Sequence, residues 1–162
     1  MESVKVVPVK TTDKTSGPML DMGDLEALVE IFSRMKEVQL IFNLNTKYLL
    51  DGQDLNRKVL SSDSYADLIR LGLRKRESVG HFVSCAGFIR KIGGGRTFFI
   101  IRDTYRRYGI QIQPFEAILQ GINRVDGREG GILAIVPKKY EGALIGNLEG
   151  FKLVIWDNGT PF

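Results

Sequence analysis

The sequence contains one cysteine and one histidine among 162 residues, and this scarcity excludes several classes of protein. Cys85 alone cannot form an internal disulfide framework, and together with His81 it supplies too few ligands for a structural zinc site. No apolar run approaches the roughly 18 residues that a membrane-spanning helix needs. The first residues lack the basic start and apolar stretch of a secretory signal. We therefore expect a cytoplasmic protein with no membrane span, metal site or cofactor.

Groups suited to catalysis are equally scarce. His81 lies in a strand-like segment whose alternation places His81, Val83 and Cys85 on one face, which indicates a packed or edge histidine. The acidic residues are spread through expected helices and turns, not paired for acid–base chemistry. The glycines at 93–95 precede a strand and lack the Lys-Ser/Thr of a phosphate-binding loop. We predict no catalytic residues and lean against an enzyme.

Basic residues, in contrast, are clustered. The net charge is +4, and three short segments, 70–76, 90–96 and 102–107, hold ten of the 23 lysines and arginines. One interpretation is that these are solvated loop ends. The other is a surface for a polyanion, and the aromatic residues beside the clusters favour it.

The hydrophobic pattern predicts an α+β protein. In the first half we expect an edge strand at "VKVVPV" that tolerates Pro8, a helix from an Asp24 N-cap, a strand at 38–45, and a second helix from Ser62-Asp63. The segment between the strand and the second helix is ambiguous.

The second half is predicted to be mainly strands. We expect them at 81–92, 96–103, 108–115, 132–140 and 151–158, with a short helix at 116–123, a loop at 124–131, and 141–150 joining the last two. This order is typical of a five-stranded OB-fold barrel, although periodicity does not exclude another small barrel. The predicted division is a helical and mixed region, 1–77, and an OB-fold domain, 78–162.

One predicted strand combines aromatic and basic side chains. Phe98, Ile100 and Arg102 would share one face, and Phe99, Ile101 and Asp103 the other. An exposed Phe could stack a base for roughly 1–3 kcal/mol. Gln111 and Gln113 could offer donors and acceptors to a base edge. The alternative is that both phenylalanines are core and both glutamines are surface residues.

The segment "GFIRKIGGGRTFFIIRD", followed by "GIQIQ", resembles the anticodon-binding OB domain of class II aminoacyl-tRNA synthetases of the aspartyl, asparaginyl and lysyl group. Gly87 to Arg90 match the first element of that pattern. Phe98 with Ile101 to Asp103 matches the second, and Gly109 with Gln111 the third. The resemblance covers about residues 78–162 and is weaker after residue 128.

The resemblance implies roles for individual residues. Phe98 would stack on the central anticodon base, Gln111 would read that base, and Arg90 would contact a base or phosphate. The remaining residues of the implied interface are Lys91, Arg96, Arg102 and Gln113. The class II catalytic motifs are absent, so we do not expect this chain to aminoacylate tRNA by itself.

The sequence therefore predicts an RNA-binding OB module whose partner is tRNA or a single-stranded loop. Two alternatives remain. The first is a small viral-type matrix or nucleoprotein component, with residues 24–45 joining two or more copies. The second is a single-stranded DNA-binding OB protein, which recognition of the 2′-hydroxyl would distinguish from an RNA binder.

Overall fold

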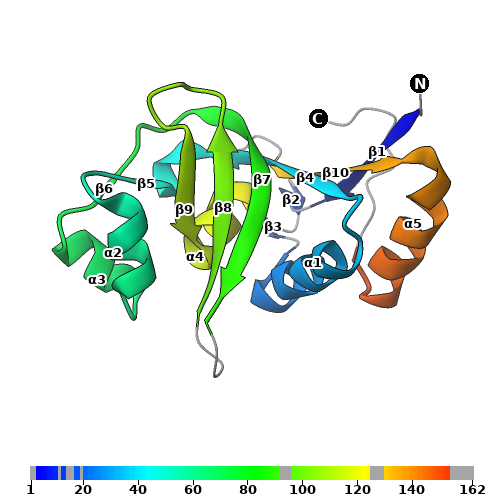
Figure 1. Ribbon diagram of the computed structural model, residues 1–162, viewed down its shortest axis with the longest axis horizontal. Coiled ribbons are helices and arrows are strands. Elements are labelled where there is room, and N and C mark those ends of the chain that lie inside the picture. Colours follow the sequence, from blue (N-terminus) through cyan, green and yellow to red (C-terminus); the bar gives the residue numbers. More distant parts are fainter. Residues whose placement is uncertain are drawn as a thin grey trace.

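The centre of the fold is one antiparallel sheet flanked by helices (Figure 1). The computed structural model describes residues 3–10, 12–13, 17–18, 20–91, 96–124 and 130–153. Within these residues the sheet has the order β1-β10-β4-β7-β8-β9, and all neighbours run antiparallel. Its strands are β1 (Val4–Lys10), β4 (Gln39–Asn45), β7 (Gly80–Arg90), β8 (Thr97–Asp103), β9 (Ile110–Pro114) and β10 (Gly131–Pro137).

The α+β class is confirmed, but the sheet differs from the expected five-stranded barrel. Its six strands form an open sheet, with β1 and β9 at opposite ends of the order. The sheet does not form the expected barrel because β10 pairs with β1 and β4 and not with β7, β8 or β9. Of the strand predicted at 151–158, residues 151–153 follow a helix as a turn, and the remainder lies outside the described residues.

Strands from both sides of residue 77 share this sheet. The predicted strand at 38–45 is β4, which lies between β10 and β7, so both of its edges are hydrogen-bonded within the chain. It is therefore unavailable for strand pairing with another copy. The predicted edge strand is β1, and Pro8 lies within it, where the missing N–H is tolerated. The two halves of the chain consequently share one sheet.

Three helices cover one face of the sheet: α1 (Met22–Arg34), α4 (Phe115–Ile122) and α5 (Glu141–Gly150). In α1 the N-cap is Asp21, not Asp24 as expected. The two aspartates form a capping box in which each carboxylate accepts the other's backbone N–H at 2.9 Å. The predicted helix at 116–123 is α4. The segment expected to join two strands is α5, which buries Leu144 and Leu148 against the same core.

Two short helices, α2 (Leu55–Ser61) and α3 (Tyr65–Arg70), cover the opposite face at β8 and β9. The predicted second helix corresponds to α3, with Ser64 as its N-cap. Leu55 and Val59 of α2 and Leu68 of α3 pack in a second cluster with Phe98. Strand β8 is therefore buried on both faces at this point.

The remaining elements are short: β2 (Thr12–Asp13), β3 (Gly17–Pro18), β5 (Leu50–Asp51), β6 (Arg74–Lys75) and the 3-10 turns η1 (Thr46–Tyr48) and η2 (Lys138–Tyr140). Strands β5 and β6 pair with each other and bring Arg74 and Lys75 close to the end of the large sheet. The glycine turn at 93–95 and most of the predicted loop at 124–131 lie outside the described residues. In the described part of the chain, no helix combines the length and apolarity needed to cross a membrane.

Candidate functional site

A buried ion pair lies where β6 ends and β8 ends. Nη1 of Arg76 donates to Oδ2 of Asp103 at 2.7 Å, and the two side chains are 2% and 0% exposed. Nη2 of Arg76 donates to Oε1 of Gln111, which also accepts from Nε2 of Gln113 at 3.2 Å. Nε of Arg76 is buried without a hydrogen-bond partner in the described part of the molecule. The pair ties the segment after β6 to the end of the sheet.

The Asp103 carboxylate is held ionised by its neighbours. Burial alone would raise its pKa, but the Tyr105 N–H, the His81 imidazole and the Arg76 guanidinium all hydrogen-bond to it, and together they lower its pKa. Oδ1 lies 2.8 Å from Nε2 of His81 and accepts the Tyr105 N–H, also at 2.8 Å. A single carboxylate thus fixes an arginine, a histidine and the start of the following loop.

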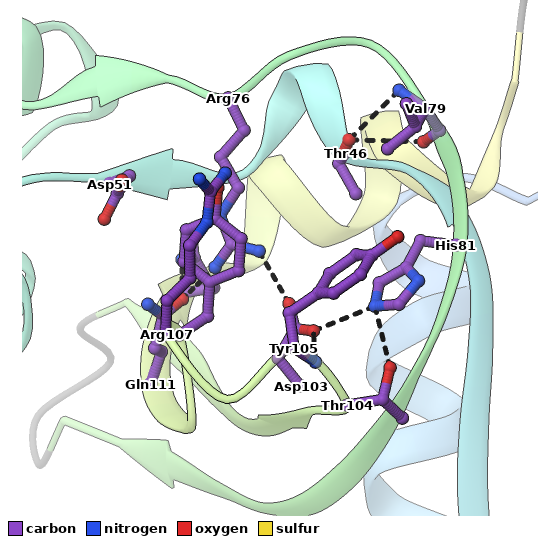
Figure 2. A network of polar contacts seen from close by, with 12 residues as sticks. Thr46, Asp51, Arg76, Val79, His81, Asp103, Thr104, Tyr105, Arg107 and Gln111 are labelled. Carbon is purple, nitrogen blue, oxygen red and sulfur yellow. Dashed lines mark hydrogen bonds and ion pairs between the residues drawn. The ribbon is translucent and has the colours of Figure 1, made fainter.

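The His81 ring is held in place by this network and is not arranged as a catalytic relay. Alternation predicted it on the face of Val83 and Cys85, and the structure places it at the border of their core, with an 11% exposed side chain. Thr104 Oγ1 lies 3.3 Å from the same Nε2 that contacts Asp103 (Figure 2). A triad needs its acid and its hydroxyl on opposite ring nitrogens. Here both contact one nitrogen, which favours orientation of the ring over activation of Thr104.

The loop from 104 to 109 presents two tyrosines at this end of the sheet. Gly109 has a φ of +55°, and its carbonyl accepts the Asp103 N–H at 2.8 Å, closing the loop between β8 and β9. Tyr105 stacks on His81 with a centroid distance of 4.6 Å and an interplanar angle of 16°. Its side chain is nevertheless 53% exposed. His81 thus supports one face of the Tyr105 ring, the Tyr108 ring lies near it in an edge arrangement with a centroid distance of 6.4 Å, and about half of the residue is still exposed.

The second tyrosine of the loop, Tyr108, is engaged by cations. The guanidinium carbons of Arg76 and Arg107 lie 3.6 Å and 4.4 Å from its ring centroid, and Arg107 also donates to its hydroxyl. In Figure 2 the Arg76 and Arg107 side chains overlap in the view, on the side of the network away from His81. Cation–π contacts of this kind hold both guanidinium groups in place.

A cavity of about 450 Å³ opens between the loop and the segment after β6. This volume lies within the roughly 300–1,000 Å³ of typical ligand pockets. The lining residues are Thr46, Arg76, Glu77, Val79, Tyr105, Arg106, Arg107 and Tyr108. Three arginines and two tyrosines therefore surround one hollow, with Glu77 as the acidic group.

Phe98 does not have the position that base stacking requires. Its side chain is 0% exposed, because α2 and α3 cover the sheet face on which it lies. Lys91 and Arg96 were expected beside it and do lie there, with Nζ and the guanidinium carbon 5.7 Å and 5.5 Å from the ring centroid. A base could reach this ring only if the two helices moved away. The predicted stacking role of Phe98 is therefore wrong for this structure.

The two glutamines are also structural. Gln113 is 0% exposed, and its amide donates to the Leu50 carbonyl at 2.8 Å and accepts the Leu50 N–H at 2.9 Å. Gln111 is 7% exposed and accepts from Arg76. Their hydrogen-bonding groups serve the strand β5 and the buried ion pair. The predicted base-reading role is thus not available to the Gln113 amide in this arrangement, whereas Gln111, whose Oε1 accepts from Arg76, also lines a cavity beside Tyr108.

The remaining predicted residues are dispersed. Arg96 forms an ion pair with Glu116 at 2.9 Å, and Lys91 Nζ lies 3.9 Å from the Asp63 carboxylate. Arg90 and Arg102 are exposed at opposite ends of the β7–β8 hairpin, since Arg90 is paired with Thr97 and Arg102 with Ser84. The structure brings Lys91 and Arg96 to Phe98, but it does not gather the predicted set into one surface.

Sequence reasoning recognised the charge clusters that build the cavity but not the aromatic residues that complete it. The segments 70–76 and 102–107 contribute Arg76, Arg106 and Arg107 to the lining. The sequence signal for these residues was the pair of tyrosines in and directly after segment 102–107, Tyr105 and Tyr108. No group of His, Cys, Asp and Glu able to hold a metal ion occurs in the residues that the structure describes.

The fold and this site define an α+β protein with one open antiparallel sheet and a cationic, tyrosine-lined cavity at one end of it. Residues 1–157 match the family of unknown function DUF6885, and the chain belongs to that family. No curated protein and no solved structure matches the chain. The cavity itself is thus the basis for a functional assignment.

Proposed function

We propose that this protein binds single-stranded RNA in the cavity lined by Tyr105, Arg106 and Arg107. The observation that carries the proposal is the Tyr105 ring, which is backed by His81 on one face and 53% exposed. An aromatic ring that is held on one face and keeps exposed surface can stack on any base. RNA recognition through Phe98 and Gln111 is not part of the proposal.

The charges around the platform suit a phosphate backbone. Arg106 and Arg107 line the cavity and are exposed, and Arg74 and Lys75 are exposed on the neighbouring strand β6. Guanidinium and ammonium groups at a rim hold phosphates without sequence preference, and their contribution falls as salt rises. We therefore expect tolerance of sequence and a strong dependence on ionic strength.

Glu77 supports RNA over DNA as the ligand. Its carboxylate can only accept hydrogen bonds, and it lines the cavity beside the arginines. A ribose 2′-hydroxyl can donate to such a group, whereas deoxyribose cannot. The proposed preference for RNA depends on this group.

The test is a binding titration with a labelled single-stranded RNA of about ten nucleotides, within the usual site sizes of single-strand binders. Tyr105→Ala should weaken binding by roughly 5- to 150-fold, and Tyr105→Phe should retain it. Phe151→Ala is the matched control, because Phe151 is an exposed ring at the end of α5. Equal affinities for wild type and a folded Tyr105→Ala protein would refute the proposal.

The contribution of the arginine charges and the preference for ribose over deoxyribose have separate tests. Arg106→Gln should weaken binding and reduce its salt dependence, whereas Lys36→Gln, an exposed change of the same charge after α1, should do neither. Glu77→Ala, which removes the acceptor, should narrow the difference in affinity between an RNA and the matching DNA. If the wild-type protein binds the RNA and the matching DNA with equal affinity, the cavity is a general site for single strands. The argument that it prefers RNA would then be refuted.

A further inference from the structure

Three cavities meet at Tyr108. The first is the 450 Å³ cavity beside Tyr105, the second has a volume of about 170 Å³, and the third about 410 Å³. Tyr108 lines all three, and Arg76, Glu77 and Arg107 line both of the first two. The hollows are therefore consecutive parts of one surface around a single ring.

The small cavity is mainly cationic. Arg74, Lys75, Arg76 and Arg107 line it, and these four outnumber the carboxylates of Asp51 and Glu77. Asp103 already neutralises Arg76, and Arg107 is held against Tyr108. Arg74 and Lys75, at the exposed strand β6, are left to supply charge to an anion. A hollow of this size and charge suits a phosphodiester group better than a base.

The third cavity offers an apolar surface and amide groups. Ile110, at the start of β9, is 62% exposed and lies in its lining. Asn56 accepts the Ile112 N–H through Oδ1 at 2.8 Å, which leaves Nδ2 as a donor for a ligand. Arg57 lies beside it, paired with Asp54 at 2.9 Å. These groups can cover one face of a flat ring and contact its edge.

Tyr108 itself acts as the divider. Tyr108 is the residue that lines both the first and the third cavity, and two guanidinium groups hold its ring in place between them. A strand passing this divider would place one base on each side and its linking phosphate beside Arg107. This arrangement is a two-base site.

We propose that the surface holds two successive nucleotides of one RNA strand, the first base on Tyr105 and the second against Ile110, with the connecting phosphate in the small cavity. The inference rests on the proposed function and adds the length of the ligand. The smallest ligand that fills the site is then a dinucleotide, and the second base is bound through groups that the first does not touch.

The experiment is a competition series against the labelled RNA with uridine monophosphate, a uridine dinucleotide and a uridine trinucleotide. The dinucleotide should bind at least about tenfold more tightly than the mononucleotide, and the trinucleotide should add little beyond that, since one stacked base contributes a factor of this order. Ile110→Ser should weaken the dinucleotide and leave the mononucleotide unchanged. Ile110→Val, which keeps the apolar surface, is the control.

The outcomes separate the two proposals. Equal affinities for mononucleotide and dinucleotide, or a dinucleotide affinity that Ile110→Ser does not change, would overturn the two-base site while Tyr105-dependent RNA binding stands. Loss of affinity for both ligands in Tyr105→Ala, with only the dinucleotide affected in Ile110→Ser, supports it. A wild-type protein that binds none of these ligands nor the longer RNA would overturn both proposals.

Discussion

Arg76 Nη1 donates to Asp103 Oδ2 at 2.7 Å across a sequence separation of 27 residues, and neither side chain exceeds 2% exposure. The pair fastens the segment after β6 to the end of β8. Both walls of the Tyr105 cavity depend on it, because Arg76 lines the cavity and Asp103 begins the loop that carries Tyr105. The stability of the fold and the shape of the cavity therefore both depend on this carboxylate.

Asp103→Asn should lower the free energy of unfolding by about 3–5 kcal/mol at pH 7, because it leaves the Arg76 charge buried without its partner. The pKa of Asp103 in the folded protein lies below its ordinary value of 3.8. Its contribution is therefore fully present above that value and is lost as pH falls through the folded pKa. Urea denaturation at several pH values should show the gap between wild type and variant closing below about pH 4.

The control for this measurement is Asp54→Asn. Asp54 pairs with Arg57 at the surface, where the side chains are 48% and 79% exposed, and asparagine tolerates its left-handed φ of 56°. It should change stability by less than about 1 kcal/mol. A loss at Asp103→Asn no greater than this, or one independent of pH, would contradict the argument.

Phe98→Ala should destabilise the fold by about 3–5 kcal/mol, because it opens a cavity between β8 and the α2–α3 pair. Phe98→Leu should cost less and keep wild-type RNA affinity, since the ring is not exposed to a ligand. Thermal unfolding and the RNA titration measure the two effects. Specific loss of RNA affinity in a stable Phe98→Leu protein would show that α2 and α3 open in solution and expose the ring.

Gln113→Ala should cost about 1–3 kcal/mol, because it leaves the buried Leu50 N–H and carbonyl without partners. Gln39→Ala, at the exposed start of β4, is the matched change and should have little effect. Hydrogen exchange at the Leu50 amide should also accelerate in the Gln113 variant. Unchanged exchange there would mean that another group satisfies the amide.

Cys85 should not react with thiol reagents in the folded protein. Burial in the core raises its pKa to about 12, against a smaller opposing effect of the Gly87 backbone. Labelling at pH 8 should be slow in buffer and rapid in denaturant. Ser33→Cys, which adds an exposed thiol on α1, should label rapidly in both conditions. Fast native labelling of wild type would show that the β7 region opens readily.

Much of the local structure was predictable. Edge strand β1 with Pro8, central strand β4, helix α4 and the β7–β8–β9 series follow from apolar alternation and helical spacing. The shifted start of α1 has a local cause, because Asp21 and Asp24 cap one another and both signal a helix start. Segment 141–150 was harder to assign, since its glycines obscure the helical pattern of α5.

The partner of each strand was not predictable, since antiparallel strands with similar apolar patterns can pair in several orders. Strand β10 lies between β1 and β4, so the strands form an open sheet and not the barrel that their order along the chain favoured. Segments 55–61 and 65–70 had no role assigned by the sequence, and as α2 and α3 they bury Phe98. Phe98 is inaccessible to a base for this reason. Alternation shows which residues share a face but not whether a helix covers it.

The sequence by itself determined the α+β class, the periodicity of individual elements and the basic segments 70–76 and 102–107. These features depend only on neighbours along the chain. Only the tertiary structure decided which aromatic rings remain exposed. It buried Phe98 beneath two helices and used Gln111 and Gln113 in internal hydrogen bonds. It also brought Arg76 and Tyr105, 29 positions apart, to one cavity, because the buried pair with Asp103 satisfies a charge that neither segment could satisfy alone.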